Sequence, residues 1–175
     1  MRDDASGRRS AELARTLVDG LVSRGLTVAV AESLTGGAVV SSLVDVPGAS
    51  RVLRGGVVAY ATDLKASLLG VEADLLAARG AVDRDVALAM AVGVRERLGA
   101  DVGVATTGVA GPDPQDGHLP GEVHVAAVGP GGARVESVVL PGDRAAVRRA
   151  TCELALELAL GVVITVDASA PTVDR

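Results

Sequence analysis

Short apolar segments alternate with amphipathic segments along most of this chain, and that alternation limits the fold more than any other feature. The runs LTVAVA at 26–31 and DVGVAT at 101–106 have the length and composition of buried strands. Before the first run, Leu13, Leu17 and Leu21 recur every four residues, which is the spacing of one face of a helix. Strands that alternate with helices predict an α/β domain with helices on both faces of a sheet.

The remaining elements follow from the same patterns and from turn residues. Gly129-Pro130-Gly131-Gly132 separates two apolar runs and predicts a hairpin, so the sheet should be mixed. We expect one domain over residues 10–165, a three-layer α/β/α sandwich, and flexible polar ends at 1–9 and 167–175. The predicted strands are 26–31, 56–60, 101–106, 122–128 and 134–140, and the predicted helices are 10–25, 37–46, 62–69, 83–98 and 143–158.

Composition excludes several classes of function. The net charge is -5 and no long basic run is present, which disfavours binding to nucleic acid. A single cysteine, Cys152, excludes an internal disulfide and suits a reducing cytosol. The first residues lack the apolar stretch of a signal peptide, and the apolar run at 154–166 is interrupted by Glu157 and too short for a membrane span. We therefore expect a cytoplasmic protein with no membrane partner.

The apolar content also bears on assembly and on one side chain. Hydrophobic residues make up 49% of the chain and the mean hydropathy is +0.39, so we expect an exposed apolar interface and a homodimer or larger homo-oligomer. Aromatic residues make up only 1% of the chain, which has one tyrosine and neither Phe nor Trp. Val, Leu and Ala must build the core, and Tyr60 is therefore a candidate for a functional role.

Two glycine-rich turns come directly after predicted strands, at 32–37 and 107–113. In open α/β sheets the ligand crevice lies beyond the carboxyl ends of the strands. Glycines permit close approach of the backbone, and the free N–H groups at a helix start attract anions. An ordinary helix cap followed by a tight turn explains the same residues, because neither the P-loop nor the dinucleotide fingerprint is present. The candidate substrate contacts are Ser33, Thr35, Gly36, Gly37, Thr107, Gly108 and Gly111.

Lys65 is the one lysine among the 17 lysines and arginines. With Thr62 as the helix N-cap, Lys65 would lie in the first turn, where the helix dipole disfavours a cation and lowers its pKa. An amine can lose its proton and act as a base near neutral pH, which arginine cannot do. The alternative is a solvated surface lysine, as most lysines are.

Ser50 follows a bend at Pro47-Gly48 and is the candidate nucleophile. A serine needs a base, and His118 and His124, in a polar loop and in mid-strand, suit loop or surface positions better. The Ser-Lys form of nucleophilic catalysis remains, with Lys65 as the base and Tyr60 relaying a proton or positioning the lysine. The alternative is that Ser50 is a turn residue and Tyr60 a packed edge aromatic.

Two further features concern anions and metals. Arg144, beside Asp143 at the start of the last helix, would suit a clamp on a phosphate, although a surface ion pair is the alternative. Two distant histidines and one cysteine make no recognisable set of metal ligands, so no metal is expected.

Several motifs together resemble the C-terminal domain of the competence/damage-inducible protein CinA. They are AESLTGG at 31–37, PGAS at 47–50, DVGVATTGVAGPD at 101–113 and PGDRAAVRRA at 141–150, in the family's order over about residues 10–162. The resemblance implies Ser50 as nucleophile and Lys65 as base, with Tyr60 assisting. It also implies that Ser33 and Thr107 line the pocket and that Arg144 matches the family's arginine.

The reaction implied by this resemblance is hydrolysis of the carboxamide of nicotinamide mononucleotide, giving nicotinate mononucleotide and ammonia without a cofactor. The family's Lys-Pro-Val-Gly segment reads Leu119-Pro120-Gly121 here, which changes the expected pocket rim. The larger N-terminal domain of full-length CinA is missing, so we expect a stand-alone amidohydrolase. The alternatives are a non-catalytic nucleotide-binding or regulatory module in competence or damage response, and a Ser-Lys amidase for another small amide.

Overall fold

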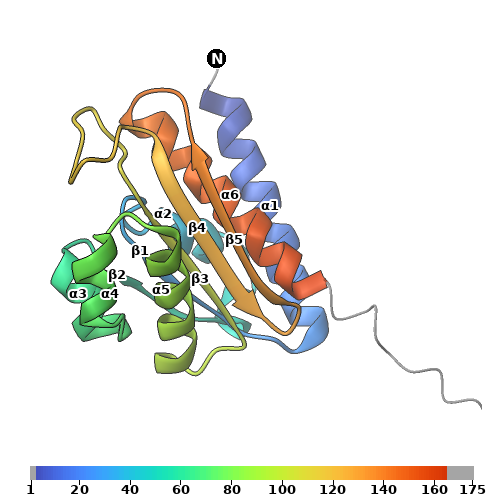
Figure 1. Cartoon of the computed structure of the whole chain (residues 1–175). Helices are drawn as coiled ribbons and strands as arrows, with labels where there is room; N and C mark the ends of the chain where they lie inside the picture. The colour runs from blue at the N-terminus through green and yellow to red at the C-terminus, as the bar shows by residue number, and fades with distance from the viewer. Residues whose placement is uncertain (1–2, 165–175) are drawn as a thin grey trace, which may run out of the picture.

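The computed structural model describes residues 3–164 and contains one five-stranded sheet in the order β2-β1-β3-β4-β5 (Figure 1). The strands are β1 (Val28–Glu32), β2 (Leu53–Val58), β3 (Val102–Gly108), β4 (Glu122–Gly129) and β5 (Gly132–Val139). The helices are α1 (Asp3–Arg24), α2 (Ala38–Val44), the 3-10 turn η1 (Ala49–Arg51), α3 (Thr62–Leu69), α4 (Ala73–Arg79), α5 (Arg84–Arg97) and α6 (Arg144–Ile164).

The sheet is mixed, as predicted. Strand β1 pairs in parallel with β2 on one side and with β3 on the other. Strand β4 runs antiparallel to β3, and β4 and β5 form the predicted hairpin. Because β1, β2 and β3 are parallel, their carboxyl ends lie at one edge of the sheet, and the segments that follow them are brought together there.

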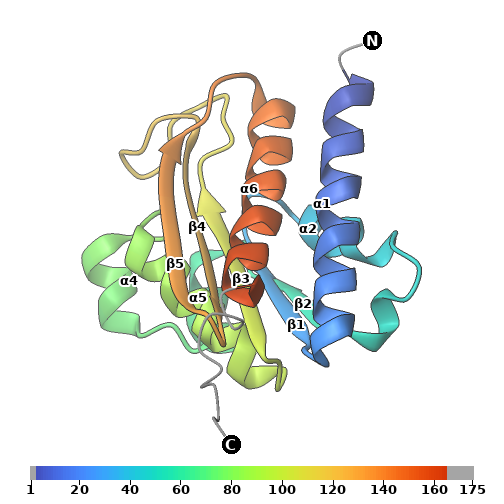
Figure 2. The same cartoon turned by 90° about the vertical axis from the view of Figure 1, so that its right-hand side faces the viewer.

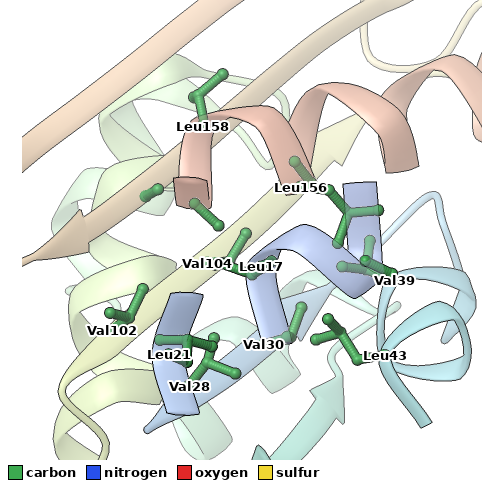
Figure 3. Close-up of a cluster of buried hydrophobic side chains, with 14 of the residues drawn as sticks. Leu17, Leu21, Val28, Val30, Val39, Leu43, Val102, Val104, Leu156 and Leu158 are labelled. Atoms are coloured by element: carbon green, nitrogen blue, oxygen red, sulfur yellow. The ribbon is translucent and has the colours of Figure 1, made fainter. Parts of the chain in front are cut away.

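Helices cover both faces of the sheet, which confirms the three-layer α/β fold (Figures 1 and 2). The larger core cluster lies between the sheet and helices α1, α2 and α6, and includes Val28 and Val30 of β1 (Figure 3). Ala29 and Ala31, which alternate with them, belong to the cluster on the face covered by α3 and α5. Successive strand residues point to opposite faces, so β1 presents valines to one layer and alanines to the other.

The small side chains of the second face allow close contact between backbones. Gly93 of α5 packs against α3 so closely that an added Cβ would overlap the carbonyl oxygen of Leu69. Gly103 of β3 is similarly close to the carbonyl oxygen of Ala91 on α5. Helix α5 therefore fixes the positions of both α3 and β3.

A buried carboxylate holds the start of α2. The side chain of Glu32 is fully buried, and its two oxygens accept hydrogen bonds from the backbone N–H groups of Gly37, Val39 and Val40 at 2.8, 3.2 and 2.9 Å. These N–H groups lack partners inside the helix, and a negative charge is favoured at the positive end of the helix dipole. Glu32 therefore supplies the anion that the sequence predicts for this turn.

Some element bounds differ from those predicted. Helix α1 begins at Asp3 rather than Ser10, so residues 3–9 are helical instead of forming a flexible end. Helix α4 was not predicted, because none of its side chains is buried and its apolar pattern is weak. Helix α3 has Ala61, not Thr62, as its N-cap. The predicted C-terminal tail lies outside the described residues. Within residues 3–164, no helix has the length and apolar character needed to cross a membrane.

We predict that Glu32→Gln destabilises the fold by about 2–4 kcal/mol, because the amide cannot accept all three hydrogen bonds and the charge at the helix start is lost. Urea unfolding followed by circular dichroism measures the change. Glu12→Gln, on the exposed face of α1, is the matched control and should change stability by less than about 0.5 kcal/mol. Equal stability of the two variants would contradict this role of Glu32.

We predict that Gly93→Ala destabilises the fold by about 2 kcal/mol or more, because the added methyl group meets the backbone of α3 and neither helix can yield cheaply. The same substitution at Gly20 of α1 is the control, since its Cβ would meet only Val163 at 3.9 Å. Gly20→Ala should stabilise the protein by up to about 1 kcal/mol through helix propensity. Chemical denaturation measures the free energy of unfolding of both variants, which should be lower than that of the wild type for Gly93→Ala and higher for Gly20→Ala.

Candidate functional site

A small pocket lies at the carboxyl ends of the three parallel strands, where the sequence predicts a ligand crevice. Its volume is about 70 Å³, which admits a small polar group but not a whole nucleotide. The segments that follow β1, β2 and β3 all contribute to its lining. The lining residues are Ser33, Leu34, Tyr60, Thr62, Lys65, Ala81, Val82, Thr107, Gly108, Val109, Ala110, Gly111, Asp113, Gln115 and Arg144.

Lys65 and Ser33 form a buried pair in this pocket. Lys65 is 1% exposed and Ser33 8% exposed, and Lys65 Nζ lies 3.2 Å from Ser33 Oγ. The amine also donates a hydrogen bond of 2.9 Å to the carbonyl oxygen of Ala59. The two bonds orient the nitrogen toward the serine hydroxyl, which is the geometry of a nucleophile beside its base.

Burial makes Lys65 a usable base. Desolvation lowers the pKa of Lys65 from 10.5 to about 8, so a substantial fraction of the amine is neutral slightly above neutral pH. Among the described residues no carboxylate pairs with this amine. Glu32, the neighbour of Ser33 in sequence, is held by the start of α2 on the other side of β1.

The residue after Ser33 offers a backbone donor. Leu34 lines the pocket, and its N–H group has no hydrogen-bond partner among residues 3–164. A backbone N–H next to a nucleophile is a common element of an oxyanion hole. Thr107 also lines the pocket, but its hydroxyl donates to the carbonyl oxygen of Ala81 at 2.6 Å and thereby fixes the wall of the pocket.

Tyr60 and Arg144 form the rim. Arg144 donates one hydrogen bond to the hydroxyl of Tyr60 at 2.9 Å and another to the carbonyl oxygen of Gly111 at 2.8 Å. Tyr60 is 58% exposed, and its hydroxyl is bonded to the arginine and not to Lys65. The hydroxyl of Tyr60 is therefore not placed to relay a proton to Lys65 or to position it, as the sequence suggested. Tyr60 lies instead at the mouth of the pocket.

The predicted pairing of Ser50 with Lys65 is not formed. Ser50 lies in η1, is exposed, and borders a separate surface hollow with Pro47 and Leu53. Ser50 precedes β2 whereas Lys65 follows β2. The strand has six residues, so its two ends lie about 20 Å apart. Ser33 could have been chosen from the sequence, because Ser33 and Lys65 follow the carboxyl ends of neighbouring parallel strands.

Three predicted substrate contacts also lie outside the pocket. The hydroxyl of Thr35 is fully buried and lies 2.8 Å from the hydroxyl of Thr106. Gly36 and Gly37 adopt left-handed backbone conformations in the turn before α2, and the N–H of Gly37 is taken by Glu32. The N–H groups of Gly37, Val39 and Val40 at the start of α2 are therefore taken by an internal carboxylate and are not available to a phosphate. Ser33, Thr107, Gly108, Gly111 and Arg144 do line the pocket, as do Tyr60 and Lys65.

The two histidines lie away from this pair. His118 Nδ1 lies 2.9 Å from Glu122 Oε1, and His124 Nδ1 lies 2.8 Å from the hydroxyl of Ser137. Neither histidine lines the pocket. A search of the described part of the chain finds no group of three or more His, Cys, Asp or Glu side chains placed to hold a metal ion.

Comparisons with known proteins agree on one family. A family model described as the CinA C-terminal domain matches residues 10–163. CinA-like proteins from Frankia casuarinae and Gloeobacter violaceus are 56% and 50% identical to this chain over 79% of its length. The matched parts are 32% and 33% of those proteins, so the chain spans about a third of their length.

Solved structures lead to the same family. The crystal structure of the competence/damage inducible protein CihA from Agrobacterium tumefaciens matches with a TM-score of 0.84 and 36% identity, over 88% of this chain and 95% of that one. A CinA superfamily protein from Klebsiella pneumoniae matches with a TM-score of 0.83 and 29% identity, over 87% and 97%. The match of the family model over most of the chain is decisive: this chain belongs to the CinA C-terminal domain family.

Proposed function

We propose that this chain is an amidohydrolase that removes ammonia from the carboxamide of nicotinamide mononucleotide, with Ser33 as the nucleophile and Lys65 as its base. The observation that carries the proposal is the buried contact of 3.2 Å between Lys65 Nζ and Ser33 Oγ. A desolvated amine beside a serine hydroxyl, with no carboxylate to keep it charged, is the arrangement that Ser-Lys catalysis requires.

The chemistry follows from these two side chains. Neutral Lys65 takes the proton of the Ser33 hydroxyl while the oxygen attacks the amide carbon, and the N–H of Leu34 is suited to stabilise the oxyanion. Lys65 then returns the proton to the departing nitrogen, which leaves as ammonia, and an ester to Ser33 remains. Lys65 then deprotonates water, which attacks the ester carbon, and the same proton passes to the leaving Ser33 oxygen, so that the carboxylate product departs and the serine hydroxyl is restored.

The size of the pocket supports a substrate in which only a small group enters. A volume of about 70 Å³ matches a carboxamide, and the rest of the nucleotide would lie across the rim. There the exposed ring of Tyr60 offers a stacking surface and Arg144 offers a cation for the phosphate. The specific choice of nicotinamide mononucleotide derives from the resemblance to the CinA family.

We predict that Ser33→Ala lowers kcat for ammonia release from nicotinamide mononucleotide by at least about 1,000-fold, and that Lys65→Met, which keeps the shape of the side chain, lowers it by about 100- to 10,000-fold. Ser50→Ala is the matched control and should stay within about twofold of the wild type, because Ser50 borders a different hollow. A coupled assay for ammonia measures all four proteins.

The other outcomes separate the competing functions. Activity lost in Ser50→Ala but retained in Ser33→Ala would contradict Ser33 as the nucleophile. A wild type that binds the mononucleotide without releasing ammonia would support a non-catalytic binding module. Faster hydrolysis of nicotinamide itself would support an amidase for another small amide.

We predict that kcat/KM rises with pH and levels off with a midpoint near 8. Below that pH Lys65 is protonated and cannot accept the proton of Ser33, whereas above it the amine is neutral. A solvated lysine would give a profile that still rises at about pH 10. A pH–rate profile between 6 and 10 measures the midpoint, and a midpoint near 6.5 would assign the base to a histidine instead.

A further inference from the structure

A second and larger cavity lies on the other side of the sheet, bounded by α1, α2 and α6 and open to solvent at the exposed side chains of Arg15 and Arg149; we call it the α1–α6 cavity. Its volume is about 410 Å³, within the range of cavities that take small organic ligands. Small residues such as Ala38 and Ala145 let the three helices leave this space open. Figures 1 and 2 show the first turns of α6 beside α1, with α2 behind them.

The charges that line the α1–α6 cavity have the opposite sign to the protein as a whole. Arg15 of α1 and Arg148 and Arg149 of α6 line it, against the single carboxylate of Asp45. The chain carries a net charge of -5, so this local excess of cations is a particular feature of the cavity. Clustered guanidinium groups are suited to bind phosphate or carboxylate.

Two of these arginines have N–H groups that make no hydrogen bond with the described residues. Arg15 makes no hydrogen bond or ion pair with any described residue. Arg148 uses Nε and Nη2 on the carbonyl oxygens of Leu34 and Thr35, at 3.0 and 2.7 Å, whereas its Nη1 has no partner in residues 3–164. The cavity therefore presents unused N–H groups to any anion that enters it.

The remaining walls favour reversible binding of an organic body rather than a covalent reaction. The hydroxyl of Ser42 lies 3.5 Å from the thiol of Cys152, which is 3% exposed. Burial raises the pKa of that thiol, so it stays protonated and is a poor nucleophile. Apolar wall atoms and hydroxyl groups beside the arginines suit a molecule that joins an anionic group to a less polar body.

Arg148 connects the α1–α6 cavity to the Ser33 pocket. The carbonyl groups that it holds belong to the turn directly after Ser33, and Leu34 itself lines the Ser33 pocket. An anion that draws the guanidinium of Arg148 toward the cavity would therefore act on the backbone beside Ser33. Arg148 lines only the α1–α6 cavity, and it reaches the Ser33 pocket through the backbone of Leu34, on the opposite side of β1.

We propose that the α1–α6 cavity is a second ligand site for a small organic anion with a phosphate or carboxylate group, and that Arg148 transmits its occupancy to the turn that follows Ser33. Binding at this site does not depend on the reaction proposed for Ser33 and Lys65. The ligand is distinct in position from any substrate held by Arg144.

Titration calorimetry with AMP and with citrate tests the binding, since one probe carries phosphate and the other carboxylate. We expect at least one probe to bind the wild type, and the double variant Arg15→Gln/Arg149→Gln to bind it at least about tenfold more weakly. Arg84→Gln, which removes one positive charge from α5 on the opposite face, is the control and should bind as the wild type does. Adenosine should bind more weakly than AMP.

Three results would overturn the binding site. They are no binding of either probe at millimolar concentration, binding of AMP with an affinity that adenosine equals, or binding lost in Arg144→Gln but retained in Arg15→Gln/Arg149→Gln. The last result would place the ligand in the Ser33 pocket. The connection is tested separately by NMR, where the amide signals of Leu34 and Thr35 should shift together with those of Ser42 and Cys152 as the probe is added. Binding without shifts at Leu34 and Thr35 would overturn the role of Arg148.

Discussion

The buried carboxylate of Glu32 fixes the turn on which the candidate site depends. Its three hydrogen bonds tie the end of β1 to the start of α2, so the chain between them can take only a narrow set of paths. Ser33 is the next residue, and because successive strand residues point to opposite faces, it is directed away from Glu32 and toward Lys65. One carboxylate thus holds the start of α2 and directs Ser33, the proposed nucleophile, toward Lys65, while its own hydrogen bonds lie on the other side of β1.

Keeping Lys65 without a counter-charge lowers the stability of the fold. A pKa lowered from 10.5 to about 8 corresponds to roughly 3 kcal/mol. Because the folded-state pKa lies below the unfolded value, this penalty is complete below about pH 8 and disappears as the pH rises toward 10.5. If Lys65 had only a structural role, its replacement by leucine or methionine would make the protein more stable. A destabilising amine beside a serine hydroxyl is better explained by chemistry, because functional sites are where such penalties are retained.

Much of the fold could be predicted from the sequence, because apolar periodicity and glycine turns report on single elements. The mixed sheet and the hairpin were predicted in this way. The last helix was predicted to start at Asp143, and the side chain of Asp143 accepts a hydrogen bond from the N–H of Ala146 at 2.8 Å. The pairing of Lys65 was not predicted correctly, since partners far apart in sequence depend on which strand ends share an edge. Ser50 is near Lys65 in sequence and at the opposite end of β2 in space. The glycines before α2 suggested that a bound ligand would supply the anion at this helix start. The anion is instead the side chain of Glu32, whose role was not predicted from its position at the end of a strand.

Helix α6 contributes residues to both the Ser33 pocket and the α1–α6 cavity. Arg144 and Arg148 are four residues apart, so both project from the same face of the helix, one toward the rim at Tyr60 and one toward the turn after Ser33. A small displacement of the first turns of α6 would therefore move the rim and the turn together. The α1–α6 cavity borders those same turns, which means that a ligand bound there acts on the helix that already connects both parts of the Ser33 pocket. Coupling between the two sites then requires only a shift of one packed helix, a motion well within the range of helix movements in allosteric proteins.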